Sequence, residues 1–342
     1  MQVELKNKRI ISIDFMRGLT VAFMIFVNSP GSWNHVLPCF THAPWNGCTF
    51  ADLVFPFFLF IVGLSIFFSS VSAKEISSGP PLFKFIKRTV LLFLIGLLIN
   101  GFPFYQLSTL RIPGVLQRIS IVYLACAILN RYASRFFQFM LMLGILVGYW
   151  LLMSFVKPPG VAGTSLTPAD NLSAWVDAQV FKNHVWAQTK PWDPEGLLGS
   201  FPAIATGIIG MLTAEMLQRI REKRVPLYAL PITGLLLVIA GIGWNLSFPI
   251  NKNLWTSSYV LFTGGIAQLF LAAIYWLIDE KGHRKFTIPF LAFGSNAILA
   301  YIFSELLEAS WSNIFLEENY PVKSWVFEHF FANWLPPLTA LM

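Results

Sequence analysis

The chain has 342 residues, of which 56% are hydrophobic, 16% are aromatic and only 12% are charged. Soluble proteins carry about 25% charged residues, so a deficit along the whole chain is typical of an integral membrane protein. The net charge of +7 comes from short clusters of Lys and Arg between apolar runs, whereas nucleic acid requires a continuous basic patch. We therefore expect a membrane protein that binds no nucleic acid.

Apolar stretches long enough to cross a bilayer, which takes roughly 20 residues, recur along the chain. They lie at 11–32, 50–72, 85–103, 113–130, 136–156, 197–217, 226–246, 255–278 and 286–308. A further stretch begins near Val326 and is still apolar at Met342, so we expect this last helix to be truncated. No cleavage site follows the first stretch, which is therefore expected to stay in the protein. The sequence predicts an all-α fold over residues 1–342, a single polytopic bundle of about ten transmembrane helices.

Basic residues alternate from loop to loop along the chain. Clusters occupy the N-terminus and every second loop thereafter, at 6–9, 74–88, 131–135, 219–224 and 281–285. The intervening loops carry few, such as Arg111 and Lys252, and the first carries none. Because loops rich in Lys and Arg stay in the cytoplasm, we expect a cytoplasmic N-terminus and an external long loop at about 157–196. No internal repeat is evident, which weakly disfavours transporter folds built from two related halves.

The external loops combine aromatic residues with amides, carboxylates and arginine. Aromatic residues alone would form the belt seen at membrane interfaces, but this mixture on one side only indicates a binding site. The predicted substrate-binding residues are Trp45, Asn46, Asp52, Arg111, Asp193, Glu195 and Asn251. For Asp52, which opens the second apolar stretch, capping of a helix N-terminus is the alternative role.

His42 is the candidate for acid–base or nucleophilic chemistry, because an unperturbed imidazole titrates at about pH 6.5. The alternative is an interfacial histidine that only hydrogen-bonds the backbone, which is the role we expect for His35. Asn28 lies near the external end of the first helix, before a Ser-Pro-Gly breaker. Its amide could orient a histidine, polarise a carbonyl or satisfy freed backbone groups.

Several further residues have predicted structural roles. Asp14 and Arg17 are spaced for a local ion pair. Cys39 and Cys48 share one external loop, so a disulfide and two free thiols are both open, and no spacing resembles a metal site. Glu305 lies within the ninth apolar stretch, where an ionisable group is functional or paired by default.

Six segments together resemble the heparan-α-glucosaminide N-acetyltransferase family, in particular its bacterial members. In chain order they read RIISIDFMRGLTVAFMIFVN, HAPWNGCTFADLVFPFFLFIVG, LRIPGVLQRISIVYL, WDPEGLLGS, INKNLWTSSYV and FGSNAILAYI. The resemblance implies a transmembrane acetyltransferase in the bacterial inner membrane. It would move acetyl from cytosolic acetyl-CoA to a glucosamine-type amine on the far side. The family's histidine in the HAxWNG segment falls on His42, and its first-helix asparagine falls on Asn28.

This function predicts a cofactor site near the cytoplasm. We expect acetyl-CoA to contact cations, namely Arg17, Lys84, Lys87, Arg88 and Arg118, and to extend its pantetheine arm toward His42. His42 would act as a general base for direct transfer or carry an acetyl group itself, and Asn28 would hold the imidazole or stabilise the oxyanion. The alternative is a transporter for N-acetylglucosamine or a related oligosaccharide, with Glu305 as a proton site. The oligomeric state is left open, with a homodimer as one alternative.

Overall fold

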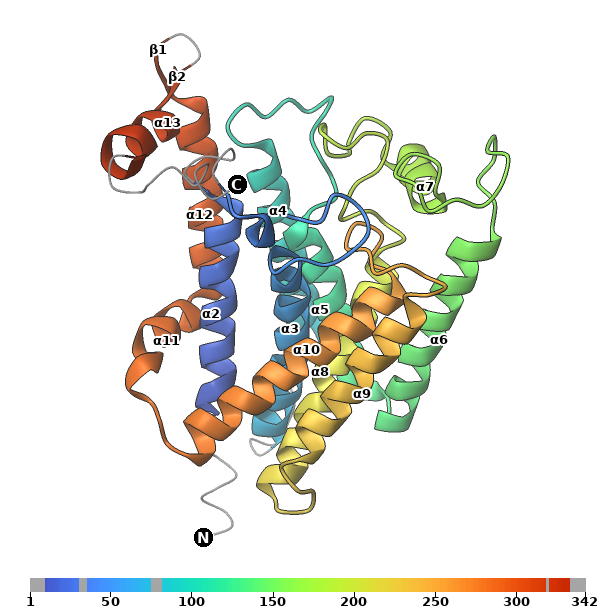
Figure 1. The fold of residues 1–342 in the computed structure, drawn as a ribbon, viewed down its shortest axis with the longest axis vertical. Coiled ribbons are helices and arrows are strands. Elements are labelled where there is room, and N and C mark those ends of the chain that lie inside the picture. The colour runs from blue at the N-terminus through green and yellow to red at the C-terminus, as the bar shows by residue number, and fades with distance from the viewer. Residues whose placement is uncertain (1–9, 31–35, 75–81, 318–319, 333–342) are drawn as a thin grey trace.

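The structure, a computed structural model, describes residues 10–30, 36–74, 82–317 and 320–332. It is a bundle of long helices with loops gathered at its two ends (Figure 1). The long helices are α2 (Ile11–Asn28), α3 (Ala51–Lys74), α4 (Leu82–Gly101), α5 (Val115–Tyr132), α6 (Arg135–Phe155), α8 (Ser200–Arg221), α9 (Ala229–Trp244), α10 (Ser257–Tyr275) and α12 (Ala297–Asn313). The short elements are η2 (Pro38–Phe40), α7 (Leu172–Val180), η3 (Trp276–Glu280), η4 (Lys285–Thr287), α11 (Ile288–Ser295), β1 (Phe315–Glu317), β2 (Tyr320–Pro321), α13 (Val322–Phe327) and η5 (Glu328–Ala332).

The predicted helical membrane architecture is confirmed, with one short pair of strands, β1 and β2, beside the helices, but the predicted number of spans is not confirmed. Among the residues that the structure describes, five helices are long and apolar enough to cross a membrane, namely α2, α3, α6, α8 and α10 with η3, and the bent pair α11–α12 makes six. The other predicted stretches also form helices. However, three of these helices are not apolar or long enough to count as spans. Helix α4 carries three cations in its first turns, α5 contains several polar residues, and α9 has only 16 residues. The stretch predicted from Val326 begins with α13 and η5, and its remainder lies outside the described residues.

The ninth predicted stretch is broken at Asn296, where α11 and α12 meet at 74°. Gly294 and Ser295 precede the break, and Asn296 forms it. All three are weaker helix formers than alanine or leucine. Helix α11 packs tightly on α2, because a Cβ on Gly18 would lie only 1.7 Å from the carbonyl oxygen of Phe290. This close approach holds the bend against the first helix.

The centre of the bundle is the pair α3 and α8, with α10 and α5 beside it. Their backbones touch through small residues, as is common between membrane helices: a Cβ on Gly63 would lie 2.0 Å from the carbonyl oxygen of Gly207. Buried side chains such as Leu59, Leu64 and Ile208 fill the surrounding core. Helix α3 is therefore a fixed axis, and both sites described below are built on it.

The two ends of the bundle differ in their loops (Figure 1). One end, here called the α7 end, holds the loops that precede α3, α5, α8 and α10, together with α7. The opposite end, here called the basic end, holds the start of α2 and the turns that precede α6, α9 and α11. The polar loops singled out in the sequence all lie at the α7 end. The assignment of that end to the external side stays a prediction from loop charge.

Candidate active site

The centre of the site is a hydrogen-bonded pair at the start of α3. Nδ1 of His42 lies 2.8 Å from Oδ1 of Asp52, whose side chain is only 1% exposed. A carboxylate accepts hydrogen bonds, so we assign the ring proton to Nδ1, which leaves the lone pair of Nε2 available. The imidazole itself is 47% exposed. A histidine oriented by a buried carboxylate, with its other nitrogen accessible, is equipped to accept a proton.

Asp52 also organises the loop that carries the histidine. Its Oδ2 accepts the backbone N–H groups of Ala43 and Thr49, each at 3.0 Å. The hydroxyl of Tyr259 on α10 donates to the main-chain oxygen of Asp52 at 2.6 Å. Asp52 therefore orients His42 through Oδ1 and holds the loop before α3 through Oδ2. The two roles are compatible because they use different oxygens.

Lys252 completes this cluster and was missed by the sequence reasoning. Its Nζ lies 3.1 Å from both ring nitrogens of His42 and 3.7 Å from Oδ1 of Asp52. Burial lowers the pKa of the Lys252 ammonium, while the charges of Asp52 and Glu195 act in the opposite direction. One signal could have identified it: Lys252 is the only Lys or Arg in the loop before α10.

Asn46, Asn251 and Trp45 are brought together, and their polar groups fasten the loops. The amide of Asn251 donates to Oδ1 of Asn46 at 3.1 Å, and the N–H of Gly47 donates to the oxygen of Ile250 at 2.7 Å. The left-handed φ of Gly47, +108°, suits a glycine at this junction. The indole of Trp45 donates to the oxygen of Leu166 at 2.8 Å. These contacts fix the His42 loop relative to Lys252.

Arg111, Asp193 and Glu195 form a second cluster at the same end. The Arg111 guanidinium donates to both oxygens of Asp193, at 2.8 and 2.6 Å, and to Glu195 at 2.5 Å. Burial acts to lower the pKa of Arg111, but the hydrogen bonds and charges of the two carboxylates raise it overall. Asp193 is fully engaged, since Oδ2 also accepts the N–H of Trp186. Glu195 also acts electrostatically on Lys252, which places it toward the histidine site.

Asn28 does not hold the imidazole, a role that the structure gives to Asp52. Its amide donates instead to Oε1 of Glu305 on α12, at 3.3 Å. Edge-to-face contacts of Phe26 with Phe40, and of Phe40 with Phe50, join the end of α2 to the His42 loop. The Asn28–Glu305 pair therefore belongs to the α7 end, while its part in any reaction stays a prediction. His35 lies outside the described residues.

Three thiols are present and none is bonded to another. Cys39 is exposed, Cys48 is partly buried and Cys126 is buried, all three free. Burial and the neighbouring Asp52 raise the pKa of Cys48 to about 12, so this thiol stays protonated and is a poor nucleophile. In the part of the chain that the structure describes, no group of three or more His, Cys, Asp or Glu side chains could hold a metal ion.

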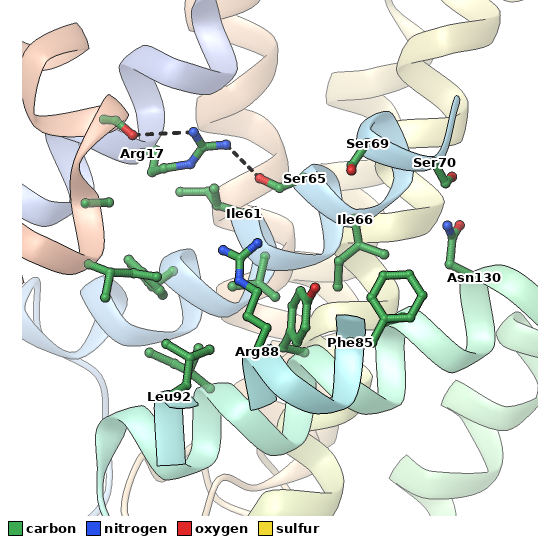
Figure 2. A pocket seen from close by; sticks show the side chains of 18 of the residues that line it. Arg17, Ile61, Ser65, Ile66, Ser69, Ser70, Phe85, Arg88, Leu92 and Asn130 are labelled. Carbon is green, nitrogen blue, oxygen red and sulfur yellow. Dashed lines mark hydrogen bonds between the residues drawn. The ribbon is translucent and has the colours of Figure 1, made fainter. Parts of the chain in front are cut away.

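A pocket of about 790 Å³ opens in the half of the bundle toward the basic end (Figure 2). Arg17 and Arg88 both line it, and Arg17 donates to the Ser65 hydroxyl at 2.7 Å while pairing with Asp14 at 3.0 Å. Arg88 lies over the Tyr123 ring, 4.9 Å from its centroid. The first residues of α12 line the pocket too, and a helix N-terminus favours negative charge.

The pocket points along α3 toward the histidine. It follows this helix from Ser70 to Phe58, roughly 18 Å of helix axis. Asp52 lies roughly 9 Å further along the same helix. Arg17, Arg88 and the hydroxyls of α3 share the lining with apolar side chains such as Leu92 and Phe85. A pocket of this kind suits a phosphate-bearing group attached to a long arm.

The other predicted cofactor residues lie elsewhere. Lys84 and Lys87 are exposed on α4 and do not line the pocket. Arg118 is 1% exposed at the α7 end of α5, where it donates to the oxygen of Gly196 at 3.1 Å and lies 5.0 Å from the Trp255 ring centroid. Arg118 is therefore separated from Arg17 and Arg88, because α5 starts at the end opposite to theirs.

Together the fold and the site define a helical membrane protein with a histidine–carboxylate pair at one end and a cation-lined pocket reaching toward it. Residues 9–249 match the family described as "Heparan-alpha-glucosaminide N-acetyltransferase, catalytic", and the chain belongs to this family. It is 32% identical to the heparan-alpha-glucosaminide N-acetyltransferase of Homo sapiens and 31% identical to that of Mus musculus, each over 88% of this chain. The chain spans about half the length of these curated relatives, 53% and 54%. The resemblance seen in the sequence is thus confirmed at the level of the family.

Proposed function

We propose that this protein is a transmembrane acetyltransferase of the bacterial inner membrane. It takes acetyl from cytosolic acetyl-CoA and transfers it to the amine of a glucosamine-type sugar at the α7 end, on the periplasmic side. The observation that carries this proposal is the shared axis: the His42–Asp52 pair and the cation-lined pocket are both built on α3. The names of the relatives supply the reaction class.

The chemistry follows from the accessible Nε2 of His42. Because a protonated amine cannot attack a carbonyl, the bound ammonium first releases one proton to water, and Nε2 then accepts a second proton from the neutral amine as its nitrogen adds to the thioester carbon. The C–N bond forms, the C–S bond breaks, and the imidazolium returns its proton to the departing thiolate. Asp52 stabilises the imidazolium through Nδ1–H. General base catalysis of this kind contributes about 10²–10⁴ in rate.

We favour direct transfer over an acetyl-histidine intermediate. The imidazole is 47% exposed, so an acetyl group on Nε2 would be open to hydrolysis by water. An amino-sugar amine is already a good nucleophile once it has lost its proton, and a base suffices for that step.

The donor is held by the pocket at the basic end. Arg17 and Arg88, with the N-terminus of α12, attract the phosphates of CoA, while Lys84 and Lys87 provide positive charge outside the pocket. The pantetheine arm runs past Leu92 and Phe58 toward His42. Arg118 is left out of this donor site because it lies at the other end.

The acceptor is held at the α7 end. The carboxylate of Glu195 attracts an ammonium group, and the perpendicular rings of Trp45 and Trp192, 5.0 Å apart, offer apolar faces for a sugar ring. Because the Asn28 amide is bonded to Glu305, we place this pair beside the acceptor rather than on the histidine.

The test uses purified protein in lipid nanodiscs with labelled acetyl-CoA and a panel of glucosamine oligomers. We expect labelled N-acetyl product with wild type and at least a hundredfold less with His42→Ala, about the contribution of a general base. His184→Ala is the matched control, since His184 lies at the same end and its ring bonds only the oxygen of Leu110 among the described residues. Full activity in folded His42→Ala would remove His42 from the reaction.

A transporter for N-acetylglucosamine or an oligosaccharide remains the second candidate, because α11–α12 is a broken helix with Glu305 beyond its break. Broken helices often form transport sites. Labelled N-acetylglucosamine that enters proteoliposomes without acetyl-CoA, and fails to enter with Glu305→Gln, would support transport over transfer.

A further inference from the structure

Lys252 lies beside the reacting nitrogen of His42 in an unusual geometry. Its Nζ is 3.1 Å from Nδ1 and 3.1 Å from Nε2. A hydrogen bond along a ring lone pair is short to one nitrogen only, so equal distances place the ammonium over the ring. Nδ1 is already bonded to Asp52. The ammonium is thus next to Nε2 without being directed at its lone pair.

The donors of this ammonium are only partly used. Its contact to Oδ1 of Asp52, 3.7 Å, is longer than a hydrogen bond. In the described part of the chain the other contacts of Nζ are those to the imidazole. An ammonium has three N–H donors, so donor capacity remains toward the space beside Nε2. The side chain is only 15% exposed, where a charge acts more strongly than in bulk water.

The loop holding Lys252 is fixed rather than loose. Asn251 donates to Asn46 and its Oδ1 accepts the N–H of Leu254 at 2.9 Å. The N–H of Trp255 donates to the oxygen of Lys252 itself at 3.0 Å. A donor that is already in place needs little reorganisation when charge develops, and this is the main advantage of an oxyanion site.

We propose that Lys252 is a catalytic residue of the transfer reaction, whose ammonium donates a hydrogen bond to the acetyl oxygen as the amine adds to the thioester. This proposal rests on the proposed acetyltransferase function. The amine nitrogen that gives its proton to Nε2 forms a bond to the carbonyl carbon. The oxyanion on that carbon therefore develops within reach of the Lys252 ammonium, which already touches Nε2. The oxygen carries negative charge only in the tetrahedral intermediate, so Lys252 stabilises that state over the bound thioester. The proton stays on Nζ, and the hydrogen bond is released when the C–S bond breaks.

The test separates charge recognition from packing by using two analogues of acetyl-CoA. Carboxymethyl-CoA carries a carboxylate beside the position of the acetyl oxygen. In S-ethyl-CoA the group on the sulfur is an ethyl group, which is similar in size to acetyl but has no oxygen. Their dissociation constants are measured by calorimetry for wild type, Lys252→Met, Lys252→Arg and the control Lys157→Met, whose lysine is exposed in another loop of the α7 end. Turnover with acetyl-CoA and glucosamine is measured in parallel.

We expect Lys252→Met to bind carboxymethyl-CoA about tenfold to a hundredfold more weakly, the loss of one hydrogen bond to a charged group. S-ethyl-CoA should bind unchanged, which also reports that the variant is folded. Turnover should fall about 10²–10³-fold through kcat, with partial recovery in Lys252→Arg. If wild type and Lys252→Met bind carboxymethyl-CoA equally, the proposed role of Lys252 is overturned while the acetyltransferase proposal stands. The same conclusion follows if Lys252→Met binds both analogues more weakly by the same factor. Failure of wild type to bind either analogue would overturn the acetyltransferase proposal and this one with it.

Discussion

Replacement of Asp52 by asparagine tests the central pair with almost no change in shape. The amide presents an N–H₂ or a neutral oxygen to His42, so the imidazole loses both its charged partner and the tautomer that leaves Nε2 free. Opposite charges about 4 Å apart interact by about 4 kcal/mol at an effective dielectric of about 20. The 47% exposure of the imidazole reduces this to about 3 kcal/mol by solvent screening. A barrier raised by about 3 kcal/mol slows the reaction about a hundredfold.

The assay is kcat and KM for acetyl transfer to a glucosamine acceptor by Asp52→Asn, with Tm measured alongside. We expect the loss in kcat and little change in the KM for acetyl-CoA, because the pocket proposed for CoA lies further along α3. Asp170→Asn is the control, since Asp170 is an exposed carboxylate of the same end. A kcat within threefold of wild type in folded Asp52→Asn would refute the reasoning, because the exposed imidazole would then work without its carboxylate.

Four further outcomes follow from the structure. Arg88→Ala should raise the KM for acetyl-CoA about tenfold with kcat little changed, measured in the same assay, as expected for the loss of about 1.4 kcal/mol of phosphate binding. Burial raises the pKa of Asp177 in α7 from 3.8 to about 7, so the folded state holds this proton more tightly than the unfolded state. Its contribution to stability is therefore present at pH 4 and is lost as the pH rises through about 7; Tm should fall over this window in wild type and much less in Asp177→Asn. In a Cys39→Ser background, Ala169→Cys should react with an impermeant maleimide on intact spheroplasts. Ala169 suits this test because it is exposed, whereas Ser173 of the same loop is buried. Labelling only after lysis would invert the predicted orientation. Without acceptor, labelled acetyl-CoA should leave no acetyl on denatured wild-type protein, and acceptor-dischargeable label on His42 would favour the covalent route.

The positions of the helices could be read from hydropathy because the bilayer thickness sets the length of apolar stretches. The stretch predicted at 136–156 is the helix Arg135–Phe155, for example. The break at Asn296 could not be read in this way, since composition records how apolar a segment is and not its direction. The 74° bend depends on the contact of α11 with α2, which only the fold brings about.

The candidate site was predictable as a set of residues but not as a set of pairs. Trp45, Asn46 and Asn251 were expected together because their loops share one side of the membrane, and the structure bonds Asn251 to Asn46 while Trp45 bonds Leu166. Which side chains bond depends on loop paths and helix rotation. The sequence therefore offered Asn28, as a partner of the imidazole or of the oxyanion, and did not offer Asp52 as the imidazole's partner, and it overlooked Lys252.

The distribution of charge between the two ends matches the two substrates that the proposed reaction needs. Glu195 and the buried Asp52 lie at the α7 end, where a cationic amine would arrive, and each is paired there with a cation, Arg111 and Lys252 respectively. Arg17 and Arg88 line the pocket nearer the basic end, where an anionic CoA would enter. Neither substrate has to pass the other's charges, because only the neutral acetyl arm would cross the apolar stretch of α3 between Leu64 and Phe58. A bundle that kept the donor's phosphates and the acceptor's amine on opposite sides could thus acetylate a sugar without transporting either molecule.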